Sequence, residues 1–292
     1  MSATDRFALN HITAPGLRFA AFAALARGLG ITEVEIRNDL AGVEIADGTE
    51  PARVRAEAEA AGVGILTINA LQKFNVWNAE RAAEAAALAA YAQACGAGAL
   101  VLCPLNSTAD RRSQSERHAD LVAALEGLAP ILAGHGLTGL VEPLGFPESS
   151  LRTKRAAVDA IDEAGLAARF RLVHDSFHHA VAGEGEFFPT RTGLVHISGV
   201  EDEGLPVAAA RDSHRVLVGP RDRLGNAAQM AALARGGYAG PFSFEPFAAS
   251  VHAAADIGAD LRASIAFLRA ALSAPPAPSQ QDAPRTPSTR AG

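Results

Sequence analysis

The sequence contains little cysteine. Cys95 and Cys103 are the only two cysteines in 292 residues, and neither belongs to a CxxC pair. Zinc ribbons and disulfide frameworks need more cysteines at closer spacing, so both kinds of scaffold are excluded. We interpret the two cysteines as small buried hydrophobic residues.

Long apolar runs and basic clusters are also missing. Nowhere do about 18 apolar residues follow one another, and residues 1–10 lack the basic stretch and apolar core of a signal peptide. The formal net charge is −6 and the basic residues are scattered, so no broad basic face is predicted for phosphates or anionic lipid. We therefore expect a cytoplasmic protein that binds neither nucleic acid nor a membrane.

Motifs for phosphate binding and for serine hydrolysis are absent. No GxGxxG follows the first apolar run, and no GxSxG occurs. The segment "AGEGE" (182–186) lacks the lysine and hydroxyl residue of a P-loop, and its two acids would repel phosphate. These absences favour a small neutral polyol or keto sugar as substrate over a sugar phosphate.

The chain instead alternates short apolar runs with Ala-, Leu-, Arg- and Glu-rich stretches of helical spacing. At 49% hydrophobic residues it is long enough for one large α/β barrel or two domains. We expect strands within residues 7–13, 33–38, 64–70, 99–104, 137–143, 170–176, 193–199 and 241–247. Eight repeats of about 34 residues predict a single (β/α)8 TIM barrel domain over residues 1–273, with a doubly wound sheet as the alternative.

The end of the chain has a different composition. Residues 274–292 contain five prolines and almost no large apolar side chains. Such a segment cannot bury enough apolar surface to offset the entropy of ordering it. We expect a disordered, proline-rich tail.

Polar side chains stand at the ends of four successive predicted strands. They are Glu142, Asp175, His196 and Glu245. In a barrel these positions share the C-terminal rim, where three carboxylates would repel one another unless a cation lay among them. Three oxygen ligands and one nitrogen ligand suit Mn²⁺, Mg²⁺, Co²⁺ or Zn²⁺.

Each of these residues also has a simpler interpretation. Asp175 alone fits a helix N-cap better than a ligand, and His196 alone fits a hydrogen-bonded core histidine as well as it fits a ligand. The coincidence across four strands favours one divalent metal ion.

Eight short segments follow one another along the chain: "LNHIT", "VEIRND", "NALQKFN", "VEPLGFP", "HDSFHH", "VHISGVED", "HRVLVGP" and "FSFEPF". Together they resemble the xylose isomerase-like TIM barrels, which act on sugars and polyols. The resemblance runs from about residue 7 to residue 270 and is nearest to the inosose isomerases of inositol catabolism. It implies the same four metal ligands, with Glu142 and Glu245 also acting as acid and base.

The resemblance implies a specific reaction. An inosose isomerase interconverts 2-keto-myo-inositol and 1-keto-D-chiro-inositol by proton transfer through a metal-stabilised enediolate, without a redox cofactor. A ketose 3-epimerase, or a dehydratase of the inosose or 3-dehydroshikimate type, would keep the same ligands and stays open. A non-catalytic barrel and an abasic-site endonuclease fit less well. Relatives often form dimers or tetramers, so the resemblance is also compatible with a homo-oligomer.

Two further residues are candidates for catalysis. His178 lies three positions after Asp175, where it can contact the substrate or a ligand, although a solvent-facing loop histidine is the alternative. Arg215 lies in the long loop after the seventh strand, where the resemblance implies an arginine that reaches the pocket, although the sequence alone fits a solvated loop arginine equally well. This loop reads "VGPRDRLG" and departs from the PGxG pattern of relatives, which leaves its shape open.

Five residues near strand ends are candidates for substrate binding. Asn69 and Glu35 end the third and second strands, and His11 lies near the end of the first. Glu35 can instead pair with a neighbouring base. Phe74 and Trp77 offer an apolar wall for the C–H face of a polyol, although aromatic residues more often serve packing.

Overall fold

A closed parallel barrel forms the centre of the chain. The structure is a computed structural model that describes residues 6–273. The strands pair in sequence order and β8 closes onto β1. They are β1 (Phe7–Asn10), β2 (Glu33–Arg37), β3 (Gly64–Gln72), β4 (Ala99–Cys103), β5 (Thr138–Val141), β6 (Phe170–Asp175), β7 (Thr192–Ile197) and β8 (Phe242–Phe244). The predicted TIM barrel is confirmed, whereas the predicted tail lies outside the described residues.

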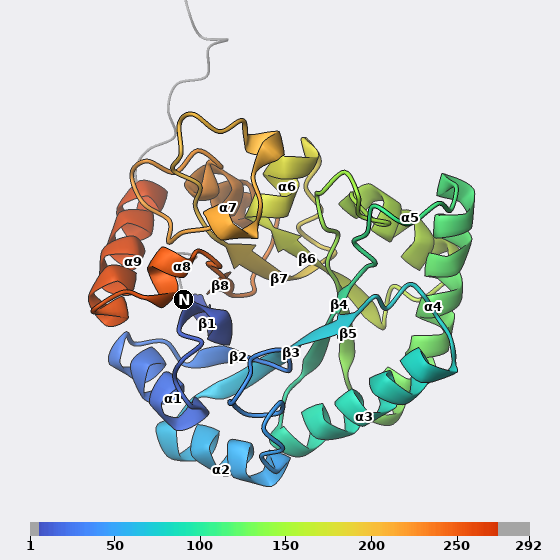
Figure 1. Ribbon diagram of the computed structural model, residues 1–292, viewed down its shortest axis with the longest axis horizontal. Coiled ribbons are helices and arrows are strands. Elements are labelled where there is room, and N and C mark those ends of the chain that lie inside the picture. Colours follow the sequence, from blue (N-terminus) through green and yellow to red (C-terminus); the bar gives the residue numbers. More distant parts are fainter. Residues whose placement is uncertain (1–5, 274–292) are drawn as a thin grey trace, which may run out of the picture.

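Helices form a ring around the strands (Figure 1). They are α1 (Phe19–Gly28), α2 (Pro51–Ala61), α3 (Ala79–Cys95), α4 (Gln114–Gly134), α5 (Lys154–Glu163), α6 (Ser176–Ala182), α7 (Asn226–Arg235), α8 (Ala249–His252) and α9 (Ile257–Ser273). Short 3₁₀ turns are η2 (His11–Thr13), η3 (Val207–Ala209) and η4 (Asp212–His214). Within residues 6–273, none of the helices has the length and apolar character needed to cross a membrane.

Local sequence signals set several helix ends. The side chain of Asn78 accepts the backbone N–H of Arg81 at the start of α3, and Ser113 forms a capping box with Glu116 at the start of α4. Helix α3 ends at Gly96, whose φ of 86° would strain a residue with a side chain. These signals fix where each helix turns back toward the next strand.

The barrel interior divides into an apolar part and a polar part. Small and medium apolar side chains from the central strands fill one level of the interior: Ala70, Ala99, Val101, Cys103, Leu140, Val173 and Leu194. A larger apolar layer lies between the strands and the helices. Several buried charged side chains, among them Arg37, Glu142, Asp175 and Glu245, lie at the carboxyl ends of the strands, so polar groups concentrate at one end of the barrel.

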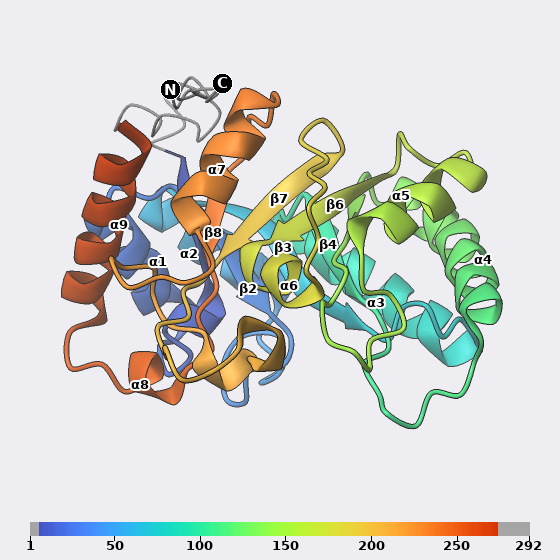
Figure 2. The same ribbon diagram turned by 90° about the horizontal axis from the view of Figure 1, so that it is seen from above.

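Long loops cover that end of the barrel. The loop between β7 and α7 carries η3 and η4, and it lies on the same side of the barrel as α8 (Figure 2). Phe146, after β5, packs against the rings of Phe177 and His178 in α6. The guanidinium of Arg211 lies 5.2 Å from the Phe146 ring centre, which joins the two loops over the barrel end.

Candidate metal centre

Four side chains converge at the carboxyl end of the barrel. Glu142 directly follows β5, Asp175 ends β6, His196 lies in β7 and Glu245 directly follows β8. Each offers one ligand atom, and these atoms lie within 4.8 Å of one another. All four side chains are buried. The strand-end pattern therefore corresponds to a real cluster in space.

The imidazole of His196 lies between the two glutamates. Its Nδ1 atom is 2.9 Å from Oε1 of Glu142 and 3.2 Å from Oε2 of Glu245. On the other side of the cluster, Nη2 of Arg215 donates to Oδ2 of Asp175 at 2.7 Å and to Oε2 of Glu245 at 2.9 Å. The carboxylates are thus close enough to share a cation.

The other carboxylate oxygen of Asp175, Oδ1, caps a helix. Oδ1 accepts the backbone N–H groups of Phe177 at 2.7 Å and His178 at 3.0 Å, which makes Asp175 the N-cap of α6. The capping interpretation is therefore confirmed, and it is compatible with a ligand role because capping uses only one oxygen of the carboxylate.

Three residues that the sequence analysis missed hold the outer oxygens of the two glutamates. Arg37 and Asn10 donate to Oε1 of Glu245 at 3.0 Å and 3.2 Å. The Cys103 thiol lies 3.4 Å from Oε2 of Glu142. Asn10, Arg37 and Cys103 are the last residues of β1, β2 and β4. The strand-end rule would have found them if it had been applied to every strand.

Burial and charge act in opposite directions on the pKa values. Burial raises the pKa of Glu245, but His196 and Arg215 lower it to about 2. Burial lowers the pKa of His196, yet the carboxylates of Glu245, Glu35 and Glu142 raise it well above its usual value. The ionised carboxylates and the positive groups of the protein therefore stabilise one another in this cluster.

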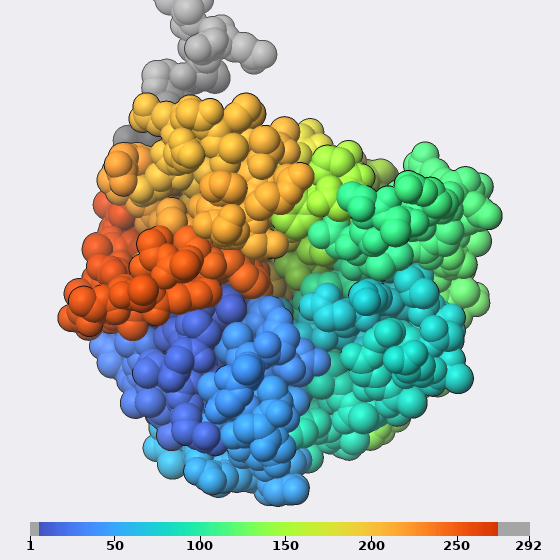
Figure 3. Space-filling view, viewed as in Figure 1, coloured from blue at the N-terminus to red at the C-terminus, as the bar shows by residue number. Residues whose placement is uncertain are grey.

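A cavity of about 290 Å³ opens above the cluster. Among the predicted site residues, it is lined by Asn69, Glu142, His178, Arg215 and Glu245. Figure 3 shows a hollow near the middle of this face, where blue, orange and green segments meet. The cavity gives a small molecule access to both glutamates.

His178 is well placed to bind a ligand in this cavity. Its side chain is 5% exposed, and its Nδ1 atom has no hydrogen-bond partner among residues 6–273. The rings of Phe146 and Phe177 pack against it edge to face, with ring centres at 5.0 and 5.2 Å. Because His178 lines the cavity, its ring lies where a bound molecule could contact it.

Glu35 contacts the cluster through His196 but does not border the cavity. It is fully buried, and both of its oxygens lie 3.2 Å from Nε2 of His196. Burial raises its pKa, but His196 and neighbouring hydrogen-bond donors lower the pKa to about 2. Glu35 therefore contacts the candidate metal ligand His196, and it does not reach the cavity where a substrate would bind.

The structure does not bring His11, Phe74 and Trp77 to the cavity. The ring of His11 stacks on Phe22, and its Nε2 lies 2.7 Å from a backbone carbonyl oxygen. Phe74 is fully buried in the main core, and Trp77 packs so closely on Gly127 of α4 that no Cβ would fit there. These three side chains serve packing, which corrects their assignment to substrate binding.

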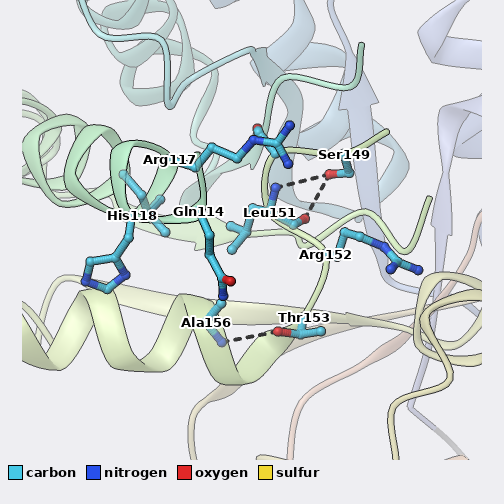
Figure 4. A pocket seen from close by; sticks show the side chains of 10 residues that line it. Gln114, Arg117, His118, Ser149, Leu151, Arg152, Thr153 and Ala156 are labelled. Carbon is cyan, nitrogen blue, oxygen red and sulfur yellow. Dashed lines mark hydrogen bonds between the residues drawn. The ribbon is translucent and has the colours of Figure 1, made fainter. Parts of the chain in front are cut away.

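A second cavity lies between α4 and α5, away from the cluster. It measures about 390 Å³ and is lined by residues of both helices and of the loop before α5. In Figure 4 the side chains of Arg117, His118 and Arg152 point in different directions. His118 is paired with Glu163 at 2.7 Å. This cavity gathers no set of groups that could carry out chemistry together.

The sequence places the chain in a known family. It matches the family described as xylose isomerase-like TIM barrel over residues 23–271, and the chain belongs to this family. No curated protein matches it.

Solved structures share this fold. A xylose isomerase domain containing protein from Salmonella typhimurium LT2 is 35% identical, with a TM-score of 0.83 over 92% of this chain and 97% of that one. The IolI protein with a bound zinc atom is 20% identical, with a TM-score of 0.81 over 92% and 98%. An L-ribulose 3-epimerase is also 20% identical, with a TM-score of 0.70 over 91% and 94%.

Proposed function

We propose that this protein is a divalent-metal-dependent isomerase of a keto-polyol or keto sugar. The specific reaction that we propose is the conversion of 2-keto-myo-inositol to 1-keto-D-chiro-inositol. One observation carries the proposal: Glu142, Asp175, His196 and Glu245 bring four ligand atoms within 4.8 Å of one another beside a cavity. Family membership and the zinc atom in the IolI protein support it.

The donor set fits a divalent ion. Three carboxylates and one imidazole suit Mn²⁺, Zn²⁺, Co²⁺ or Mg²⁺. Cys103 borders the cavity but is not among the four residues whose ligand atoms converge, and burial raises its thiol pKa well above the usual value. When bound, the ion would supply Lewis-acid stabilisation of the negative charge that develops on the substrate oxygens.

The protein side chains would divide the remaining work. Glu142 and Glu245 both border the cavity, where one can take a proton from the carbon beside the ketone and the other, or the same one, can return a proton to the neighbouring carbon. His178 lines the same cavity, where its ring could hydrogen-bond a substrate hydroxyl. Arg215 balances negative charge next to both Asp175 and Glu245.

The cavity also limits the size of the substrate. Its volume of about 290 Å³ is near the lower end of small-molecule sites, which suits a single sugar or cyclitol. Uncharged polar groups from Asn69, Gln72 and Asn106 line the same space. These groups match a ligand that carries several hydroxyls.

A ketose 3-epimerase is the second candidate. A carbinol centre can be inverted when one base removes the proton and a second group delivers it from the opposite side. The two glutamates that border the cavity could serve that purpose as well, and the similarity to L-ribulose 3-epimerase supports it. A dehydratase of the inosose or 3-dehydroshikimate type would begin with the same proton removal.

Product analysis separates these reactions. The metal-loaded protein should be incubated with 2-keto-myo-inositol and with ketohexoses, and the products followed by NMR. A carbonyl that moves to the neighbouring ring carbon supports the inosose isomerase. Inversion of a ketohexose at carbon 3 would favour the epimerase, and a new absorbing enone or diketone would favour a dehydratase.

A further inference from the structure

Glu35 is a carboxylate enclosed within the barrel. It is fully buried, and it accepts hydrogen bonds from Thr67 Oγ1 at 2.7 Å and from Asn69 Nδ2 at 2.8 Å. A third donor is the hydroxyl of Ser243, and Nε2 of His196 lies 3.2 Å away. The side chain therefore has a complete set of donors, and all of them belong to the protein.

Burying a carboxylate inside a barrel is unfavourable for the free energy of folding, because the charge loses its hydration. Removing the charge from water is unfavourable unless hydrogen bonds offset it, and an apolar side chain would avoid this penalty. Neighbouring interior positions such as Ala70, Val101 and Leu140 are indeed apolar. Packing alone does not explain an acid at position 35.

The strand register aligns this carboxylate with His196. Glu35 of β2 pairs with Thr67 of β3, and His196 of β7 pairs with Ser243 of β8. Donors from β3 and β8 thus hold the carboxylate in place, so that it faces the imidazole across the interior. The contact is fixed by backbone pairing rather than by a mobile loop.

We propose that Glu35 is a positioning residue that orients the His196 ring for metal binding. Nε2–H of His196 donates to Glu35, which leaves Nδ1 facing Glu142 and Glu245. A ring that is free to rotate would present the wrong nitrogen to the cluster for part of the time. Metal-ligating histidines commonly have such a carboxylate partner, which fixes the ring and its tautomer. The inference rests on the metal centre of the proposed function.

Metal affinity is the appropriate test because a merely structural role would not change it. We would titrate Co²⁺ into metal-free wild type and Glu35→Gln, and follow both binding heat and visible absorption. Loss of the carboxylate should weaken Co²⁺ binding by about 10- to 100-fold, the usual effect of removing such a partner. The absorption bands should also change, because the imidazole would sit differently.

Glu44→Gln is the matched control. Glu44 is also buried, but it accepts the backbone N–H of Phe19 and does not border the cavity or touch His196. This variant should lose some thermal stability while binding Co²⁺ as tightly as the wild type. Equal weakening in both variants would show a general effect of removing a buried charge and would overturn the proposal.

Softer variants keep the test decisive if Glu35→Gln does not fold. Thr67→Val and Ser243→Ala each remove one donor to Glu35 while leaving His196 and Glu35 in place. Each should weaken Co²⁺ binding several-fold, and unchanged affinity in both would overturn the role of Glu35. If the wild type binds no Co²⁺, the metal centre itself fails; if it binds but the variants match it, only this inference fails.

Discussion

Oδ1 of Asp175 accepts the backbone N–H of His178 at 3.0 Å. The Asp175 carboxylate therefore caps the helix that carries a cavity-lining histidine. Its other oxygen, Oδ2, lies in the candidate metal cluster and accepts a hydrogen bond from Arg215. A change at Asp175 should alter both the position of α6 and the retention of metal. The two effects can be separated by the choice of substitution.

Asp175→Asn should lower metal content while preserving the helix cap. Asparagine caps helices about as well as aspartate, but its amide is a weaker ligand. Asp175→Ala should lose metal as well, and should unfold about 1 kcal/mol more easily than the asparagine variant because the cap is gone. Elemental analysis and denaturant unfolding measure the two effects. Unchanged metal content in both variants would count against Asp175 as a ligand.

Glu245→Gln should abolish turnover and leave the fold intact. The amide keeps the size of the side chain but cannot accept the substrate proton, and it loses its ion pairs with Arg37 and Arg215. Glu163→Gln, an exposed change on α5, is the control and should keep wild-type rates. Circular dichroism checks the fold, and near wild-type activity of Glu245→Gln would refute the catalytic assignment.

Gly145→Ala should displace α6 without changing any polar group. A Cβ at position 145 would lie 2.2 Å from the backbone oxygen of His178 and 2.8 Å from the backbone nitrogen of Ala182. Overpacking of this kind costs about 1–3 kcal/mol. Because the strain moves the helix that carries His178, we expect lower stability together with a raised KM. Wild-type values for both would show that the loop relaxes freely.

Metal affinity should rise with pH. In the metal-free cluster the pKa of His196 lies well above 6.5: burial lowers it, but the surrounding carboxylates raise it more. A proton on Nδ1 must leave before a cation binds, so affinity should increase by up to about tenfold per pH unit, with proton release. Titrations in buffers of different ionisation heat test this. Affinity that is constant or falls as pH rises would contradict it.

The raised pKa of His196 should make the stability of the metal-free protein fall as pH rises. Because the folded pKa of His196 is raised, its contribution to stability is full below about pH 6.5 and is lost as pH rises through the raised pKa. Without metal, this contribution should therefore decline as the solution becomes more alkaline. Thermal unfolding of chelator-treated protein over a pH series measures the change.

The sequence predicted the barrel and its main cluster because both follow from periodicity. Strand ends share one rim in a parallel barrel, so Glu142 and Glu245 could be placed together although they are far apart in the chain. Arg37 was missed because its partner Glu245 is 208 residues away, and a single arginine at a strand end looks like a solvated one. Trp77 was misplaced because the direction of a side chain after a strand depends on the loop, which periodicity does not describe.

The most direct test of the account combines elemental analysis with solvent exchange. Purified protein should be analysed for metal, then incubated with 2-keto-myo-inositol in D₂O before and after chelation, and followed by NMR. The account predicts about one divalent ion per chain, deuterium at the carbon beside the ketone, a shifted carbonyl, and loss of both changes on chelation. Metal-free protein that exchanges and isomerises the substrate at the same rate would contradict it.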